Sequence, residues 1–379
     1  MVRLGDVCTV ISGTTPKSTQ PKYWDGDLNW VTPAELTDGS VVIYESQRKI
    51  TPQAVTDSGL KSFPAGTVLL SSRAPIGKVA IAGTKMYCNQ GFKNLVCSKK
   101  IYNWYLYYFL KNKTVYLNSL GRGATFKEIS KSIVENIEIP LPPIDEQRKI
   151  VAVLDKVSNL IVKRRQQLEK LDEMVKARFV DIFGDLMINE REWKFSSLSK
   201  LCDVRDGTHD SPEYTDSGYP LLTSKNFTSG IIDFTNCNLI SKEDFDKINQ
   251  RSKVDVGDIV MPMIGTIGNP IIVNTERPFA IKNVALIKFN KSYMSNVFIR
   301  QILDSEYFEK ITSSVNRGGA QKFMALRDIR KLPIPMVSFE LQSQFATFVE
   351  QTDKSKLAIQ KSLEKLETLK KALMQKYFG

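Results

Sequence analysis

The feature of this chain that most constrains its fold is an internal repeat in which each copy ends in a long helical segment. At an offset of 195 residues, residues 119–184 of the 379-residue chain align with residues 314–379 without a gap. The string LEKL, for example, occurs at residues 168–171 and again at residues 363–366. Repeat units of this length are typical of two similar domains related by a pseudo-two-fold axis, rather than of a solenoid.

The part of each copy before the helix has the pattern of a globular domain. AGTVLLSSRAPIGKVAI at residues 65–81 resembles VGDIVMPMIGTIGNPII at residues 256–272, and LGDVCTVISGTTPKS at residues 4–18 resembles SKLCDVRDGTHDSPE at residues 199–213. Short β-rich runs separated by Gly, Pro and Asn turns predict strands, and YNWYLYYFLKN predicts an aromatic helix. These patterns predict an α+β fold with two pseudo-symmetric globular α/β domains.

Each globular part leads through prolines into a segment without Gly or Pro that is typical of one long helix. Apolar residues in both segments recur at alternating steps of four and three, which is the pattern of a coiled coil. About 40 residues at ~1.5 Å per residue make a helix of roughly 60 Å, so an antiparallel pair would hold the two domains apart as a spacer. The predicted seam consists of Ile150, Leu154, Val157, Ile161, Leu168, Leu171, Val175, Ile182, Phe345, Val349, Ile359, Leu363, Leu366 and Leu373.

The pattern divides the chain into four parts. We expect a first globular domain at residues 1–143 and a central spacer helix at residues 144–185. A second globular domain follows at residues 186–338, and a C-terminal spacer helix at residues 339–379.

The composition favours a cytoplasmic protein with an anionic partner. The net charge is +12, and residues 1–143 alone hold 17 Lys and Arg against 10 Asp and Glu, which favours nucleic acid as the partner. The five cysteines form no CxxC pair and indicate free thiols in a reducing compartment. No apolar run approaches the ~20 residues of a membrane span, and MVRLGDVCTVISG lacks the basic start and apolar core of a signal peptide.

With this layout the sequence resembles the specificity (S) subunit of type I restriction–modification systems. The resemblance is carried by LPPIDEQRKIVAVLDK and LEKLDEMVKARFVDIFGD, together with GRGATFKEI and RGGAQKFMALRDIRKLPIP before the helices. It covers essentially the whole chain, because the domain–helix unit occurs twice. At the second helix SFELQSQ replaces PIDEQRK, so we expect partner docking at that end to follow the family pattern less closely.

The resemblance implies a DNA-binding subunit without chemistry of its own. Each of two target-recognition domains would read one half of a split site in double-stranded DNA, while the helices set the gap and dock two methyltransferase (M) subunits. Restriction (R) subunits would join this core. The chain itself would bind no cofactor, and S-adenosylmethionine, ATP and Mg would belong to the partner subunits. No membrane partner is expected.

The motifs that catalysis would need do not occur in the sequence. An adenine methyltransferase needs N-P-P-[YF], which the string NPII at residues 269–272 does not match. GRGATF lacks the third glycine of a dinucleotide loop, and APIGKVA lacks the Ser or Thr of a Walker A loop. The single histidine, His209, lies in the loop DGTHDSPE, where a turn residue or DNA contact is the simpler interpretation than a base or metal ligand. Two alternatives stay open: a self-sufficient DNA methyltransferase or nuclease, and a coiled-coil scaffold unrelated to DNA.

The candidate DNA contacts lie in polar and glycine-containing loops. Side chains on base edges read sequence, whereas Lys, Arg and backbone amides on phosphates fix the register. The loop SSRAPIGK of the first domain offers two cations, while its counterpart MIGTIGN in the second domain offers none, so this loop is expected to differ between half-sites. No catalytic residue and no metal ligand is predicted. The predicted DNA-binding residues are Thr14, Lys17, Arg73, Lys78, Gln90, Lys93, Arg122, Lys127, Thr208, His209, Lys225, Lys282, Asn283, Arg317, Gln321 and Lys322.

Overall fold

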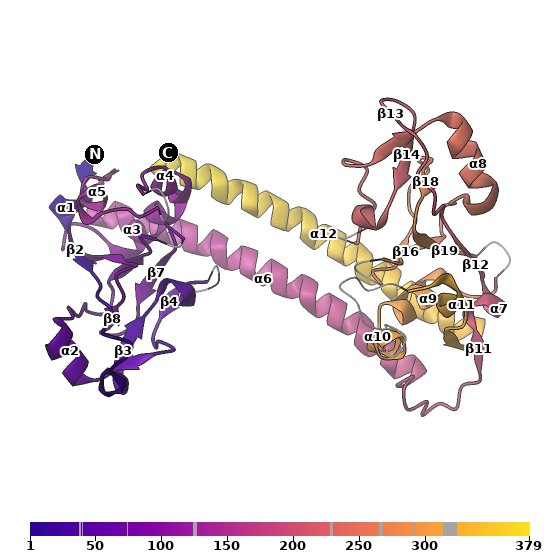
Figure 1. The fold of residues 1–379 in the computed structure, drawn as a ribbon, viewed down its shortest axis with the longest axis horizontal. Coiled ribbons are helices and arrows are strands. Elements are labelled where there is room, and N and C mark those ends of the chain that lie inside the picture. The colour runs from indigo at the N-terminus through magenta and orange to yellow at the C-terminus, as the bar shows by residue number, and fades with distance from the viewer. Residues whose placement is uncertain are drawn as a thin grey trace. The chain divides into compact units, whose positions relative to one another are not determined.

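The computed structural model (Figure 1) describes residues 1–37, 39, 41–73, 75–123, 127–227, 230–264, 268–289, 292–313 and 324–379. These residues form two compact units. Unit 1 consists of Met1–Arg165 and Lys361–Gly379, and unit 2 consists of Gln166–Gln360. Two helices of 40 residues each, α6 (Ile144–Phe183) and α12 (Phe339–Phe378), contribute one part to each unit. The structure thus groups each globular part with segments of both helices, whereas the sequence pattern treats the helices as separate parts.

Unit 1 contains two β-sheets and a strand pair. The five-stranded sheet has the order β2-β9-β6-β7-β4 and is antiparallel except between β4 and β7. The three-stranded sheet has the order β5-β3-β8 with β3 and β8 parallel, and β1 pairs with β10. The strands are β1 (Val2–Arg3), β2 (Cys8–Ser12), β3 (Trp24–Val31), β4 (Val42–Ile43), β5 (Lys49–Ile50), β6 (Val68–Leu70), β7 (Val79–Ala82), β8 (Tyr87–Cys88), β9 (Lys93–Cys97) and β10 (Glu138–Ile139). The helices are α1 (Leu4–Val7), α2 (Pro52–Ser58), α3 (Asn103–Asn112), α4 (Thr114–Ser119) and α5 (Lys131–Glu135), with 3₁₀ turns η1 (Pro21–Tyr23) and η2 (Pro33–Glu35).

Unit 2 repeats this plan with two four-stranded sheets and a strand pair. The sheets have the orders β12-β19-β16-β17 and β13-β15-β14-β18, and β14 and β18 are parallel, as β3 and β8 are in unit 1. The strands are β11 (Phe195–Ser197), β12 (Asp203–Asp206), β13 (Tyr214–Thr215), β14 (Tyr219–Leu222), β15 (Asn238–Ile240), β16 (Ile259–Pro262), β17 (Ile271–Ile272), β18 (Ala280–Ile281), β19 (Val284–Lys288) and β20 (Pro333–Pro335), the last paired with β11. The helices are α7 (Leu198–Leu201), α8 (Lys242–Ser252), α9 (Asn296–Leu303), α10 (Glu306–Ser313) and α11 (Leu326–Arg330), with the 3₁₀ turn η3 (Ser224–Phe227).

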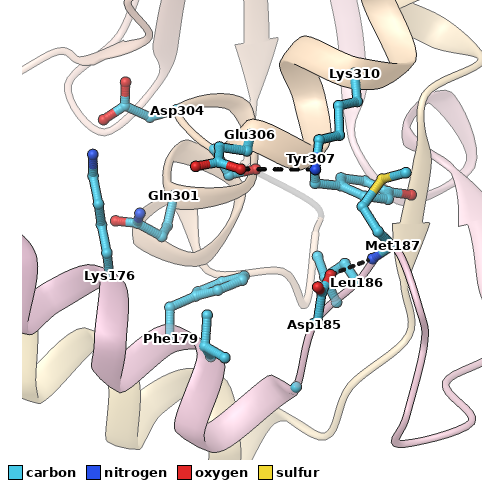
Figure 2. Close-up of a pocket in the computed structure, with 13 residues that line it drawn as sticks. Lys176, Phe179, Asp185, Leu186, Met187, Gln301, Asp304, Glu306, Tyr307 and Lys310 are labelled. Carbon is cyan, nitrogen blue, oxygen red and sulfur yellow. Dashed lines mark hydrogen bonds and ion pairs between the residues drawn. The ribbon is translucent and has the colours of Figure 1, made fainter.

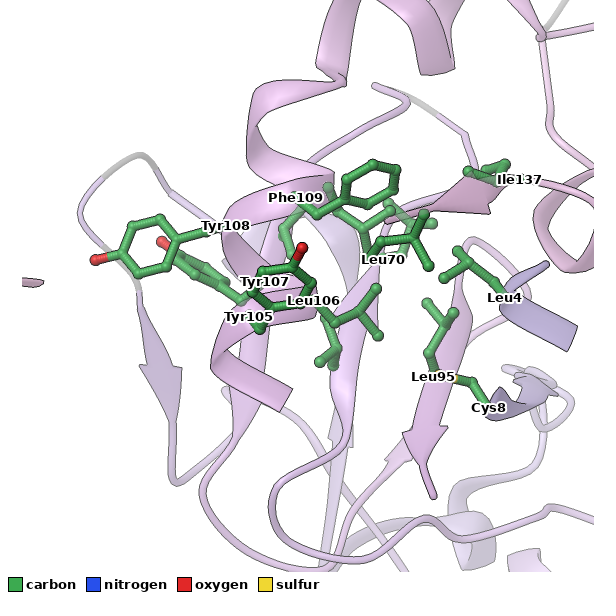
Figure 3. Close-up of a cluster of buried hydrophobic side chains, with 14 of the residues drawn as sticks. Leu4, Cys8, Leu70, Leu95, Tyr105, Leu106, Tyr107, Tyr108, Phe109 and Ile137 are labelled. Carbon is green, nitrogen blue, oxygen red and sulfur yellow. The ribbon is translucent and has the colours of Figure 1, made fainter. Parts of the chain in front are cut away.

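The core of unit 1 lies between the five-stranded sheet and the aromatic helix α3, as Figure 3 shows. Leu106 and Phe109 of α3 are fully buried in one cluster with Leu95 of the sheet. The end of α12 completes the cluster, because the ring of Phe378 lies 5.1 Å from Tyr105 and 5.9 Å from Phe109 between centroids. Aromatic pairs at this spacing add to the free energy of burial.

The core of unit 2 is closed in the same way by the end of α6. The ring centroid of Phe183 lies 4.7 Å from that of Phe298 in α9 and 5.7 Å from that of Phe345 in α12. Phe183 is the residue that aligns with Phe378 in the repeat. The same apolar position at the end of a long helix therefore closes both cores.

Within each unit the two helix segments run antiparallel. In unit 1 the start of α6 and the end of α12 share one core, and Arg165 Nη2 lies 2.7 Å from Glu367 Oε1. In unit 2 the end of α6 and the start of α12 share one core, and Lys356 Nζ lies 2.6 Å from Asp172 Oδ1. This arrangement agrees with the antiparallel pairing that the repeat predicts.

The buried stripe of both helices follows the expected seam from the start of each helix and moves by one residue near its C-terminal end. Of the fourteen seam positions, Leu168, Leu171, Ile182, Ile359, Leu366 and Leu373 are half-buried and the rest are buried. Continuing the steps beyond Val175 points to Arg178, but Arg178 is exposed and pairs with Asp181, while Phe179 is buried. A straight helix has 3.6 residues per turn rather than 3.5, so an unbroken seven-residue pattern drifts off the buried face.

A buried glutamine ties the start of each long helix to its globular part. Gln147 Oε1 accepts a hydrogen bond from Tyr102 N at 2.8 Å, and its Nε2 donates to the carbonyls of Lys100 and Pro142. Gln342 Oε1 accepts from Ser295 N at 2.7 Å, and its Nε2 donates to the carbonyl of Val337. Both glutamines are fully buried, so these bonds satisfy backbone groups that have no access to water.

Candidate nucleic-acid interface

Three loops of unit 1 meet where strands of the two sheets end. We call the meeting point of residues 13–15, 31–35 and 88–90 the unit 1 loop junction. Thr14 N donates to the carbonyl of Cys88 at 3.0 Å, and Asn89 N donates to the carbonyl of Val31 at 3.2 Å. A Cβ on Gly13 would lie 2.0 Å from the carbonyl oxygen of Asn89, so only glycine allows this approach.

Unit 2 has the same arrangement, the unit 2 loop junction, at residues 207–209, 222–226 and 281–283. Thr208 N donates to the carbonyl of Ile281 at 3.0 Å, and Lys282 N donates to the carbonyl of Leu222 at 2.9 Å. A Cβ on Gly207 would lie 2.1 Å from the carbonyl oxygen of Ile281. The two junctions share backbone bonds and a required glycine, but their exposed side chains differ.

The turn that follows the middle strand is also built alike in both junctions. In unit 1 the Glu35 carboxylate accepts hydrogen bonds from the backbone N–H and hydroxyl of Thr32. In unit 2 the Asn226 side-chain carbonyl accepts the corresponding bonds from Thr223. This side-chain bonding fixes the 3₁₀ turns η2 and η3, and η3 carries the exposed Lys225.

A cluster of charged side chains, Arg73 and Lys93 around Glu128, lies beside the unit 1 loop junction. Ser72 N donates to the carbonyl of Gly91 at 2.7 Å, which joins the loop of Arg73 to the turn that contains Gln90. Glu128 lies between two cations, with Lys93 Nζ at 2.9 Å and Arg73 Nη1 at 3.6 Å. The structure thus brings together loops that lie far apart in the sequence, and each of them carries predicted DNA contacts.

The predicted contacts differ in how they face solvent. Lys93 is buried, because its ammonium is held by Glu128 and Ser72, so it does not offer a charge at the surface. The half-buried candidates are Arg73, Lys78, Thr208, Lys282 and Asn283, and the exposed ones are Thr14, Lys17, Gln90, Arg122, Lys127, His209 and Lys225. Arg317, Gln321 and Lys322 lie outside the residues that the structure describes.

His209 is the centre of a polar cluster in the unit 2 loop junction. Its Nε2 lies 2.9 Å from Asp206 Oδ2, and its Nδ1 lies 2.8 Å from Asn283 Oδ1. The Asp206 side chain is 5% exposed and also accepts a hydrogen bond from Arg251. The hydrogen bond to Asn283, opposed by partial burial and aided by the bond to Asp206, raises the pKa of His209 above its usual value.

The partners Asp206, Arg251 and Glu128 are site residues that the sequence-based list does not contain. Asp206 stands three residues before His209, a spacing that offers a local signal. Arg251 lies on α8 and Glu128 follows a glycine-rich stretch, and neither position carries a motif. Only the folded chain brings these charges to the loops.

Unit 2 contains a buried ion cluster at positions where the matching residues of unit 1 carry no charge. Lys288 Nζ lies 2.5 Å from Asp258 Oδ2 and 2.9 Å from Asp255 Oδ2, and both Lys288 and Asp258 are buried. Asp258 follows Gly257 as Thr67 follows Gly66, and Lys288 ends β19 as Cys97 ends β9. The corresponding positions of unit 1 are thus neutral.

A surface hollow lies at the end of α6 in unit 2, as Figure 2 shows. Phe179 forms its floor, Lys176 and Lys310 bring positive charge, and Asp304 and Glu306 bring negative charge. Lys310 Nζ lies 3.7 Å from Glu306 Oε2. The exposed apolar side chains of Val180 and Met187 stand at the same hollow, which gives it the mixed character of a protein-docking surface.

Within the described residues, no group of three or more His, Cys, Asp or Glu side chains is placed to hold a metal ion. In the same part of the chain, no helix is long and apolar enough to cross a membrane.

Solved structures share this fold. The type I restriction–modification S subunit from M. genitalium matches 100% of this chain and 95% of its own with a TM-score of 0.59 at 16% identity. A chain from a structure of complex assembly and conformational transition of the type I R-M system matches 100% of this chain and 96% of its own, with a TM-score of 0.64 at 16% identity. At these identities the likeness concerns the fold.

Sequence comparisons give the family. The type I restriction enzyme MjaIX specificity subunit of Methanocaldococcus jannaschii is 29% identical over 403 residues, which cover 99% of this chain and 91% of that protein. The EcoR124I/EcoR124II specificity subunit of Escherichia coli is 25% identical over 193 residues, which cover 49% of this chain and 47% of that protein. The family model of the type I restriction modification DNA specificity domain matches twice, at residues 1–171 and 190–371. The chain therefore belongs to the family of type I restriction–modification specificity subunits and carries the DNA specificity domain of that family in two copies.

Proposed function

We propose that this chain is the non-catalytic subunit that gives a type I restriction–modification complex its DNA sequence specificity. The globular part of each unit reads one half of a bipartite site in double-stranded DNA. The observation that carries the proposal is the loop junction, which occurs twice with the same backbone bonds and different exposed side chains. A common scaffold with variable side chains is what two readers of two different half-sites need.

The side chains of the two junctions support different modes of reading. Around the unit 1 loop junction Arg73, Arg122 and Lys127 provide positive charge that suits phosphate oxygens or the acceptor edge of guanine. At the unit 2 loop junction Lys225 and Lys282 provide charge, and Asn283 provides an amide that can form hydrogen bonds with base edges.

The two long helices form the second part of the proposal. They set the gap between the half-sites and dock two methyltransferase subunits, and restriction subunits join this core. The hollow floored by Phe179 supports a docking role, because it combines exposed apolar side chains with charges of both signs.

The proposal assigns the chemistry to the partner subunits, which bind S-adenosylmethionine, ATP and Mg, and it assigns the complex to the cytoplasm. The thiols of Cys88 and Cys8 suit a structural role, since burial raises the pKa of Cys88 to about 12 and the hydrogen bond with Cys97 raises the pKa of Cys8. The purified chain is expected to show no methyltransferase or nuclease turnover with all three compounds present. Turnover by the highly pure, partner-free chain would contradict a non-catalytic subunit.

The decisive experiment lengthens both helices by one heptad. The insertions are placed after Leu168 in α6 and before Leu363 in α12, so that the seam keeps its register while each helix gains ~10 Å. Methylation mapping of host DNA is expected to return both half-sequences unchanged, separated by a gap about three base pairs longer at ~3.4 Å per base pair.

The control inserts the same heptad in α6 alone, which breaks the match between the two helices and is expected to abolish methylation. If the doubly extended protein folds, assembles and methylates with the original gap, the helices do not set the spacing.

A further inference from the structure

Each loop junction contains a side-chain amide, Gln90 in unit 1 and Asn283 in unit 2, whose carbonyl oxygen lies against a neighbouring polar side chain. The type of neighbouring side chain differs between the two junctions. In unit 1 the hydroxyl of Thr15 donates a hydrogen bond to Gln90 Oε1. In unit 2 the next residue after the shared threonine is His209, whose Nδ1 lies 2.8 Å from Asn283 Oδ1. Gln90 and Asn283 correspond, because each lies two residues after the carbonyl that accepts from Thr14 N or Thr208 N.

This hydrogen bond decides which end of the side-chain amide points towards a ligand. When the carbonyl oxygen of an asparagine or glutamine accepts a hydrogen bond from the protein, the N–H₂ group points outward and can donate to the ligand. Asn283 is half-buried, and its backbone lies in a left-handed turn with φ of 55°, a conformation that asparagine adopts more readily than most residues. Among the described residues, Asn283 Nδ2 makes no hydrogen bond that would compete with a ligand.

The protonation of His209 is coupled to this orientation. Nε2 faces a carboxylate oxygen of Asp206 and Nδ1 faces the side-chain carbonyl oxygen of Asn283. Because both oxygens are acceptors, a ring that forms hydrogen bonds with both carries two protons and a positive charge. On deprotonation the proton leaves Nδ1, because the bond from Nε2–H to a carboxylate is the stronger one. The bare Nδ1 then faces an oxygen lone pair, and the amide of Asn283 relieves this repulsion by turning its N–H₂ inward and its carbonyl outward.

Of the three hydrogen-bonded side chains Asp206, His209 and Asn283, Asp206 is held in place by a neighbouring charge. Arg251 on α8 bonds Asp206, and Lys282 bonds Ser211 on the other side of the loop. The adjoining cavity also presents Asp210 from the loop and Asp244 and Lys247 from α8. Together with Asp206 and Arg251, these side chains make three carboxylates and two cations around His209.

We propose that His209 is a positioning residue of unit 2 that makes the reading of one half-site depend on pH. As the imidazolium it fixes Asn283 as a hydrogen-bond donor, which fits a base acceptor such as guanine O6 or adenine N7. As the neutral ring it leaves Asn283 presenting an acceptor, which fits a base amino group. In unit 1 the hydroxyl of Thr15 does not titrate, so the other half-site is read alike at every pH. This inference rests on the proposed function as a DNA reader.

The test measures the affinity of the full chain, assembled with its methyltransferase subunits, for a DNA duplex that contains the site the complex methylates. The measurement is repeated from about pH 6 to pH 8.5 at constant ionic strength. We expect affinity for the intact site to fall about tenfold across the series, since one bound proton changes the binding constant by at most tenfold per pH unit. Substituting each base in turn is expected to show a changed preference at one position of the unit 2 half-site and at no position of the other.

Two variants separate a positioning role from a merely structural one. His209→Asn keeps a donor near the place of Nδ1 without a titrating group, so binding is expected to become independent of pH and to keep the low-pH preference. Thr15→Ala is the matched change in unit 1, and it is expected to leave the pH profile as in the wild type.

Since His209 is the single histidine of the chain, its own titration can be followed by NMR in protein made without a histidine tag. The midpoint is expected above the usual ~6.5 and to coincide with the midpoint of the binding profile. A flat binding profile in the wild type, or an unchanged profile in His209→Asn, overturns the inference while leaving sequence-specific binding intact. No specific binding at any pH overturns the proposed function and the inference with it.

Discussion

Unit 1 and unit 2 are built on one backbone plan, yet the polar groups inside and on them differ. Both have a glycine pressed against a carbonyl, at Gly13 and Gly207, and both anchor a long helix through a buried glutamine. Inside unit 2, however, Lys288 forms a buried ion cluster with Asp258 and Asp255, where unit 1 has neutral residues. The backbone bonds and the glycines are thus the part that both copies require, and the side chains around them are free to diverge.

The largest expected difference between the units is their response to the loss of one buried charge. Lys288→Met leaves Asp258 without its partner in the core, so we expect unit 2 to lose about 3–5 kcal/mol of unfolding free energy. The double change Asp258→Thr/Lys288→Met removes both buried charges and leaves the partly exposed Asp255 paired with Lys253, so it is expected to recover most of the loss.

Denaturant unfolding, with hydrogen exchange to assign the loss to unit 2, measures both variants of the ion cluster. Cys97→Met is the matched change in unit 1, where no charge is left behind, and its effect is expected to be well below that of Lys288→Met. A double variant as unstable as the single one would show that the lysine acts through packing rather than through charge.

The next effect is expected to be of similar size in the two units. Gln147→Leu and Gln342→Leu each leave buried backbone groups without their hydrogen bonds, and each is expected to lower the unfolding free energy of its unit by about 1–3 kcal/mol. Gln351→Leu, at an exposed position of α12, is the control and is expected to change it by less than about 0.5 kcal/mol. Hydrogen exchange at the backbone amides of Tyr102 and Ser295 reports the loss of these hydrogen bonds locally. Unchanged protection of the two amides would contradict a stabilising role of the buried glutamines.

A third prediction concerns DNA and only unit 1. Arg73→Ala is expected to weaken binding to the unit 1 half-site by about 1–3 kcal/mol if the side chain contacts a base, with a changed preference at one position. A phosphate contact would instead weaken all sequences alike and lower the salt slope by about one. The corresponding residue of unit 2 is Ile264, so Ile264→Ala is the control and should leave the salt slope unchanged. Wild-type affinity and specificity in Arg73→Ala would remove this residue from the interface.

The smallest effect is expected in acid. Hydrogen bonds from Lys253 and Lys288 lower the pKa of Asp255, so this carboxylate stabilises folded unit 2 above its unfolded pKa of ~3.9. The contribution is lost as the pH falls through the lowered pKa in the folded state. Asp255→Asn is expected to flatten the acid limb of the unit 2 stability curve slightly, and an identical acid limb in the variant would count against the pairing.

The sequence predicts the repeat, the two long helices and their antiparallel pairing, because these depend on local periodicity and on the alignment of one half with the other. It also places Thr14, Gln90, Thr208 and Asn283 in turns that the structure joins. Periodicity fails where geometry departs from the ideal pattern, as at Arg178, where the true 3.6-residue period puts Phe179 on the buried face.

The misses at the site have a different cause. The sequence predicts Lys93 as a DNA contact, but Glu128, which comes from a distant loop, holds its ammonium group in the interior. Arg251 reaches Asp206 from a helix 45 residues further along the chain. Ion pairs of this kind depend on tertiary contacts between charged residues whose local sequences carry no distinctive pattern.

The way the end of α12 enters the core of unit 1 has a consequence for the order of folding during synthesis. Unit 2 is one continuous stretch of chain, Gln166–Gln360, so all of its core is available once that stretch has left the ribosome. Unit 1 is synthesised first but needs Met374 and Phe378 to cover Tyr105 and Phe109. The globular part that is synthesised first is therefore completed last. Its apolar surface at Tyr105 and Phe109 stays exposed to solvent until the end of α12 has been synthesised.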